Sequence, residues 1–183
     1  MTSWATVRRN GLLVLGSASA LVVVTVWLSD HPRPGARTGP TAGHPELFGD
    51  AASCPRRGEA ASNGRRAEEL ARLRADRYAY DPRDGVHAVE HYQQAEACYL
   101  AAGAERSAAR ARAESATLID RVNTDYAAAR LNLINALAQE HWSVALSETR
   151  RLLRLTEHLE KDDYVEWLMR NVGRVASRAS TPP

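Results

Sequence analysis

Two histidines and a glutamate in the middle of the chain have a spacing that can hold a metal ion. His87, Glu90 and His91 follow the pattern H-x-x-E-H. Histidines at positions i and i+4 of a helix lie on one face, where they could chelate zinc while Glu90 serves as a base. A further carboxylate ligand is needed, and Glu166 is the nearest candidate by sequence separation. We favour ordinary surface histidines, with a zinc-dependent hydrolase as the alternative.

Other catalytic motifs are missing from the sequence. It contains no G-x-x-x-x-G-K-[ST] phosphate loop, no G-x-S-x-G elbow and no glycine-rich fingerprint following a strand. Asp162 and Asp163 are adjacent carboxylates in a predicted turn, and capping of the next helix explains them better than catalysis does. We therefore expect that the protein is not an enzyme and that it binds no cofactor.

The charge distribution gives no signature of a nucleic-acid partner. The formal net charge is +2, which is too small to create a strong field for gathering anions. Arginines are dense between residues 56 and 77, but acidic residues are mixed among them. A solvated helix face is the expected structure of this stretch, and contact with lipid headgroups or nucleic acid is the less favoured alternative.

The two cysteines, Cys54 and Cys98, are predicted to form one disulfide. A pair of cysteines in an exported domain is typical of such a bond. It would attach the end of a linker to a helix, and closing a loop of this size is worth about 4 kcal/mol in the chain-entropy model. Two unpaired thiols are the alternative. Neither cysteine belongs to a C-x-x-C pair, so we expect no metal there.

An uncharged apolar segment near the N-terminus predicts a membrane helix over residues 11–29. At about 1.5 Å rise per residue, it is long enough for a hydrocarbon core of roughly 30 Å. The apolar residues of the predicted span are Leu12, Leu13, Val14, Leu15, Leu21, Val22, Val23, Val24, Val26, Trp27 and Leu28. A cleaved signal peptide is the alternative, because small residues at 17–20 resemble a cleavage site. A second apolar run follows them at once, so an uncleaved anchor is favoured.

The orientation of this anchor follows from its flanking charges. Arg8 and Arg9 favour a short cytoplasmic tail over residues 1–10, although Arg33 and Arg37 weaken the bias. With the cysteines, this predicts a bacterial inner-membrane protein whose C-terminal domain is extracytoplasmic (periplasmic). A cytoplasmic adaptor is the alternative.

Beyond the anchor, composition divides the chain into a linker and a helical domain. Residues 30–64 are rich in proline and glycine and predict a flexible linker. Apolar spacings of three and four then predict helices over about 65–79, 85–102, 105–123, 125–138, 143–160 and 164–176. The third and fourth could be one continuous helix, because no glycine or proline separates them. Residues 179–183 are a predicted disordered tail.

The apolar stripes assign an inward face to each predicted helix. We expect Ser62 and Asn63 to cap the first helix. The apolar side chains that we expect to point inward include Leu70, Leu73, Tyr80, Val89, Tyr92, Cys98, Tyr99, Leu118, Val122, Leu131, Leu133, Ile134, Leu152, Leu155, Leu168 and Met169.

Two stretches of the helical domain resemble tetratricopeptide repeats (TPR). Residues 88–103 carry alanines, Tyr92, Tyr99 and Gly103 at the spacing of a repeat's second helix. Residues 132–155 place Ala136 before the aromatic Trp142, with an Ala-Leu pair and a leucine-rich run after it. The resemblance covers about half the chain, and no period of 34 residues is visible. It implies a small stack of hairpins with a concave surface for protein or peptide binding. An ordinary helical bundle is the alternative.

These features predict an all-α protein with one N-terminal transmembrane helix, a Pro/Gly-rich linker and a bundle of antiparallel TPR-like hairpins over residues 65–178. The expected function is a membrane-anchored, extracytoplasmic scaffold or adaptor for protein–protein interaction in the bacterial cell envelope. Its expected contacts are another envelope protein and the lipid bilayer, with no nucleic acid. A zinc hydrolase using residues 87–91 and a plain bundle subunit of a membrane complex are the alternatives. The partner and the oligomeric state stay open.

Overall fold

The computed structural model describes residues 43–49, 52–159 and 162–180, which form helices and no strands. The helices are α2 (Ala60–Arg77), α3 (Pro82–Ala101), α4 (Glu105–Ala138), α5 (Trp142–Leu155) and α6 (Asp163–Ala179). The all-α prediction is confirmed for these residues. The predicted cytoplasmic tail (1–10) and membrane helix (11–29) lie outside them. Among the described helices, none has the length and apolar character needed to cross a membrane.

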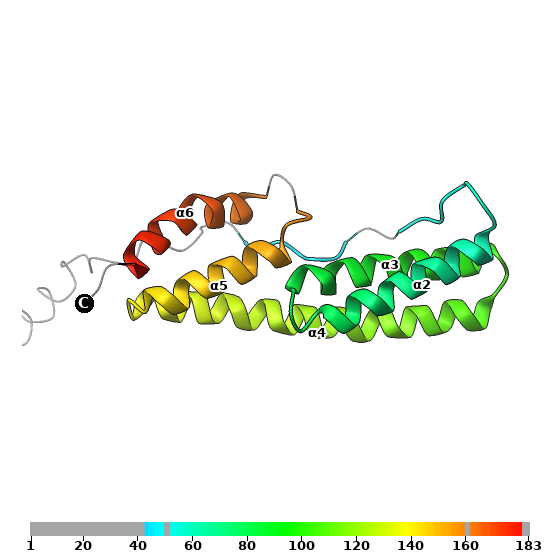
Figure 1. Ribbon diagram of the computed structural model, residues 1–183, viewed down its shortest axis with the longest axis horizontal. Helices are drawn as coiled ribbons and strands as arrows, with labels where there is room; N and C mark the ends of the chain where they lie inside the picture. The colour runs from blue at the N-terminus through cyan, green and yellow to red at the C-terminus, as the bar shows by residue number, and fades with distance from the viewer. Residues whose placement is uncertain (1–42, 50–51, 160–161, 181–183) are drawn as a thin grey trace, which may run out of the picture. The chain divides into compact units, whose positions relative to one another are not determined.

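Each helix packs against its neighbour in the sequence, from α2 on α3 to α5 on α6. The long helix α4 joins two halves of the bundle, because α3 lies along one end of it and α5 along the other (Figure 1). Residues 105–138 are thus one continuous helix, as the absence of a glycine or proline allowed. The start of α3 also contacts α5, so the two halves meet beside the middle of α4.

Short-range signals set several helix ends. The Asp81 side chain accepts a hydrogen bond from the backbone N–H of Arg83 at 3.1 Å, and Pro82 occupies the first turn of α3. Asp162 caps α6 in the same way, accepting from the backbone N–H of Tyr164 at 2.8 Å. Gly103 has φ +70° after α3, a conformation in which glycine avoids a Cβ clash.

Small residues let the first three helices approach closely. One buried cluster consists of Ala67, Ala95, Tyr99, Ala108 and Ala111 from α2, α3 and α4. A larger cluster continues through α4, α5 and α6. Its largest fully buried side chains are Leu152, Leu155 and Leu168. Leucine burial therefore contributes most in the second half, because alanine removes little apolar surface from water.

A buried carboxylate ties α2 to α3 and α4. Glu68 is only 5% exposed, and its carboxylate accepts hydrogen bonds from the Tyr99 hydroxyl at 2.7 Å and Arg110 Nε at 3.0 Å. Arg72, one turn along α2, also pairs with it. Burial alone would raise the pKa of Glu68, but the hydrogen bonds from Arg110 and Tyr99 outweigh it and hold that pKa below 4.5.

Glu68→Gln should lower the free energy of unfolding at neutral pH by about 1–2 kcal/mol, because charge-assisted hydrogen bonds are lost while the arginines stay solvated. The pKa of Glu68 in the folded state lies below its unfolded value of 4.5. The stabilisation is therefore complete above that pH and disappears as the pH falls through the folded pKa. Urea unfolding at neutral pH and at about pH 3 should show the variant's deficit shrinking in acid. An equal deficit at both pH values would contradict this assignment.

Several predicted boundaries were wrong. The first helix begins at Ala60 rather than residue 65, so Ser62 and Asn63 lie inside it and do not cap it. Asn63 instead donates a side-chain hydrogen bond to the Arg57 carbonyl at 2.8 Å, which holds the preceding turn. The fifth helix ends at Leu155, and the last helix extends to Ala179. The remainder of the predicted tail, 181–183, lies outside the described residues.

The predicted inward face was also wrong at six positions. Tyr80 is 87% exposed, and Leu70 and Leu73 on α2 are 41% and 57% exposed. Leu131, Ile134 and Met169 also face solvent. On α2 the buried residues are mostly small, since Gly64 packs against the Tyr99 ring and Ala67 and Ala71 follow on the same face. The leucines are therefore turned away from the close helix contact.

The predicted flexible linker is partly ordered on the helical body. Leu47 is 3% exposed within the larger core cluster, and Phe48 packs against that cluster. His158 Nε2 lies 2.7 Å from the Leu47 carbonyl oxygen, in hydrogen-bonding contact. The predicted linker range of 30–64 is therefore too long, because Leu47 and Phe48 supply apolar anchors within a proline- and glycine-rich segment.

Candidate functional site

The residues of the H-x-x-E-H pattern lie on α3, and two of them pair with each other. His87 Nδ1 is 3.1 Å from Glu90 Oε2, and both side chains are nearly half exposed. Burial is the main cause that lowers the pKa of His91, with a smaller opposing effect from its hydrogen bond to Gln94. The histidines are thus on one helix, as predicted, but Glu90 is engaged by His87.

The surroundings of His87 do not favour a cation. A small pocket of about 170 Å³ beside it is lined by Arg83, Arg154 and Glu157, among others. Glu166, the predicted further ligand, pairs with Arg170 at 2.9 Å on α6. Within the described part of the chain, no three His, Cys, Asp or Glu side chains form a group that could hold a metal ion.

The predicted disulfide is confirmed. Cys54 and Cys98 are bonded, with their Cα atoms 4.7 Å apart, and the bond joins residues separated by 44 positions. Cys98 is fully buried in α3. The bond thus fixes the segment before α2 to the side of α3, next to the contact between Gly64 and Tyr99.

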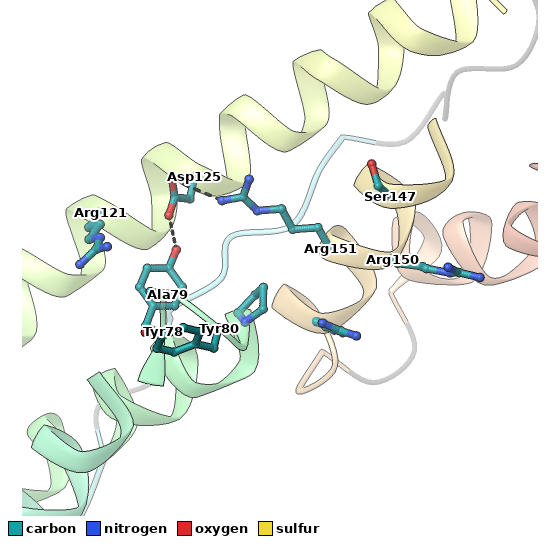
Figure 2. Close-up of a pocket in the computed structure, with 10 residues that line it drawn as sticks. Tyr78, Ala79, Tyr80, Arg121, Asp125, Ser147, Arg150 and Arg151 are labelled. Carbon is teal, nitrogen blue, oxygen red and sulfur yellow. Dashed lines mark hydrogen bonds and ion pairs between the residues drawn. The ribbon is translucent and has the colours of Figure 1, made fainter. Parts of the chain in front are cut away.

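A cleft where the two halves of the bundle meet is a candidate binding site for a partner, and we call it the arginine cleft. It has a volume of about 630 Å³. Its walls come from the α2–α3 turn, the middle of α4 and the C-terminal part of α5 (Figure 2). The lining residues are Tyr78, Ala79, Tyr80, Pro82, Arg121, Asp125, Ser147, Arg150, Arg151 and Arg154.

A tyrosine–aspartate pair joins the α2–α3 turn to α4 in this cleft. The Tyr78 hydroxyl donates to Asp125 Oδ2 at 2.6 Å, and Arg151 reaches across from α5 to Asp125 Oδ1 at 3.5 Å (Figure 2). Burial and the Asp125 carboxylate together raise the pKa of Tyr78 above its ordinary value. Tyr78 therefore stays protonated as a hydrogen-bond donor and holds the three elements in register.

The cleft is positively charged. Four arginines line it against one carboxylate, Asp125, which is already paired with Arg151 and Tyr78. Arg121 Cζ lies over the Tyr78 ring, 5.1 Å from its centroid, in a cation–π contact. Such an arrangement suits binding of an anionic group, because guanidinium N–H donors match carboxylate or phosphate oxygens.

The spacing of three arginines in the sequence indicates one wall of this cleft. Arg154 follows Arg151 by three residues and Arg150 by four on α5, so Arg154 shares one side of that helix with both. The apolar spacing, in contrast, wrongly predicted that Tyr80 points into the core. The opposing wall comes from residues far away in sequence, and only the packing of the two halves brings them together.

Comparison of the chain with protein-family models, with curated proteins and with solved structures finds no match. The resemblance to tetratricopeptide repeats therefore stays a prediction. The disulfide, the order of the helices and the arginine cleft are the features on which a function can be argued.

Proposed function

We propose that the protein is a membrane-anchored, extracytoplasmic adaptor that binds another protein through its TPR-like helical domain. The observation that carries the proposal is the arginine cleft, an open recess at the junction of two helical halves. It offers solvated cations and an exposed aromatic side chain, Tyr80. Exposed aromatic and arginine side chains are enriched where proteins bind each other.

Two further features support an extracytoplasmic location. The Cys54–Cys98 bond is of the kind that persists in oxidising compartments. The apolar segment over residues 11–29 has the length of a signal-anchor. Anchoring would confine the domain to the membrane surface and raise its effective concentration near membrane-bound partners.

The helix order supports a repeat-like scaffold without requiring a regular repeat. Consecutive helices pack as hairpins, and the continuous α4 belongs to both the α3–α4 and the α4–α5 hairpins. Because α4 is shared, it holds parts of both halves beside the cleft. A recess that is formed before binding loses less entropy when a partner binds.

A photo-crosslinking residue placed at Tyr80 in the full chain, irradiated in native membranes, tests the proposal. We expect a discrete protein adduct, because Tyr80 is 87% exposed at the cleft. The matched control places the crosslinker at Ala109, an exposed position on α4 about 24 Å along the helix axis from Asp125. Absence of an adduct at Tyr80, or the same adduct at Ala109, would refute binding at the cleft.

A further inference from the structure

We propose that the arginine cleft binds an extended, acidic segment of its partner, whose carboxylates are held by Arg121, Arg150 and Arg154. This inference rests on the proposed function, since it names the chemistry of the partner at the same cleft. It is supported by the unbalanced charge of the cleft, the unused donors of its arginines, the spread of these arginines and the shape of the walls.

The first ground is that the positive charge of the cleft is not neutralised from within. Among the described residues that line the cleft, Asp125 is the only acidic one, and Arg151 and Tyr78 already bind it. The neighbouring Asp81 is engaged by Arg83 Nη2 at 2.8 Å. Hydrogen bonds from Arg83, and more weakly the charge of Arg154, hold the pKa of Asp81 below its ordinary value. Neither carboxylate is therefore available to balance the remaining cations.

The second ground is that these cations have unused donors. Within the described residues, neither Arg150 nor Arg154 makes a hydrogen bond or an ion pair. Arg121 lies over the Tyr78 ring, and among the described residues its N–H groups make no hydrogen bond or ion pair, so they can donate to a ligand. Each guanidinium can give two parallel hydrogen bonds to one carboxylate.

The third ground is that the charges are spread along the cleft. Figure 2 shows Arg121 on α4 and Arg150 on α5 on opposite sides of the Tyr78–Asp125 pair. Charges on both sides of this pair suit an extended chain with several carboxylates better than a compact anion such as a single phosphate.

The walls of the cleft favour a polypeptide over a membrane surface. Tyr80, Ala79 and Pro82 form an apolar wall beside the arginines, which suits the side chains and backbone of a peptide. A planar bilayer surface does not enter a recess. Salt screens the exposed charges that attract the partner, so binding should weaken as the salt concentration rises.

Isothermal titration of the full chain, purified in a non-ionic detergent, tests the inference with a defined probe. The probe is a short peptide of alternating Glu and Ala, and its control has Gln in place of each Glu. We expect heat of binding for the Glu peptide that decreases with salt, and none for the Gln peptide. No binding of the Glu peptide, or equal binding of both peptides, overturns the inference.

Paired charge reversals locate the binding. Arg150→Glu with Arg154→Glu should weaken peptide binding by about tenfold or more, which corresponds to about 1.4 kcal/mol. The control reverses Arg66 and Arg106, which are exposed, lie in the N-terminal parts of α2 and α4 and do not line the cleft. Circular dichroism checks that both variants are folded. Equal loss in both pairs overturns a specific role for the cleft.

Two further outcomes separate this inference from the proposed function. If only vesicles containing anionic phospholipid, or inorganic phosphate, bind through Arg150 and Arg154, the acidic-peptide inference is wrong. If Tyr80 still crosslinks to a protein when both arginines are reversed, the adaptor function stands and the charge-based recognition fails. If the unchanged chain gives no protein adduct at all, the adaptor function itself is refuted.

Discussion

Reduction of the Cys54–Cys98 disulfide is expected to lower the free energy of unfolding by about 4 kcal/mol. The bond closes a loop between residues 44 positions apart, and the chain-entropy model gives this magnitude for such a loop. Reduction would also release the segment before α2 from α3. Urea unfolding followed by circular dichroism, with and without reductant, measures the effect.

Cys54→Ser provides the matched control, because it removes the bond while leaving the buried Cys98 side chain in place. The variant should have about the stability of the reduced wild-type chain, and reductant should not change it further. A loss below about 1 kcal/mol on reduction would show that the helices hold this segment without the bond.

Gly85→Ala is expected to destabilise the protein by about 1–3 kcal/mol, the usual cost of overpacking. A Cβ at position 85 would lie 2.6 Å from Tyr78 Cε2 and closer still to Cδ2. Tyr78 is 5% exposed and holds Asp125 across the cleft, so it has little room to move. The variant should therefore lose both stability, measured by urea unfolding, and affinity for the acidic peptide.

Gly173→Ala is the matched control for that substitution. Gly173 also lies within a helix, α6, but nothing is within 4 Å of the Cβ position. The alanine should stabilise the protein by up to about 1 kcal/mol through its higher helix propensity. If both alanine variants gain stability equally, the close approach of Tyr78 to Gly85 does not constrain the fold.

The helices and the disulfide were predictable because their signals are local or compositional. Asp81 and Asp162 mark helix starts through the geometry of one turn. The pairing of the two cysteines needed only their number and the expected oxidising compartment.

The packing partner of each helix face was not predictable in the same way. Apolar spacing placed Leu70 and Leu73 inward, yet α2 approaches its neighbour through Gly64, Ala67 and Ala71. The size of apolar side chains alone does not predict the buried face of a helix where small residues allow the backbones to come close. A short distance between helices leaves no room for leucine. Similarly, Leu47 anchors a segment whose proline and glycine content predicted a flexible chain.

The arginine cleft could not be predicted from the sequence, because the residues that form its walls are far apart along the chain. Tyr78 and Asp125 are 47 residues apart, and their hydrogen bond depends on how α2 and α3 lie against α4. The arginines of α5 become a site only after that packing places them opposite Arg121. The H-x-x-E-H pattern, by contrast, was visible in sequence but lies beside arginines that disfavour a metal ion.

Binding of an acidic partner at the cleft is tested by comparing the Tyr80 crosslinker in the unchanged chain with the same crosslinker in the chain carrying Arg150→Glu and Arg154→Glu. We expect a discrete protein adduct in native membranes that is lost with the two charge reversals, while the Ala109 control gives none. A chain that yields no adduct at Tyr80, although it is folded and its Cys54–Cys98 bond is intact, would contradict binding at the cleft.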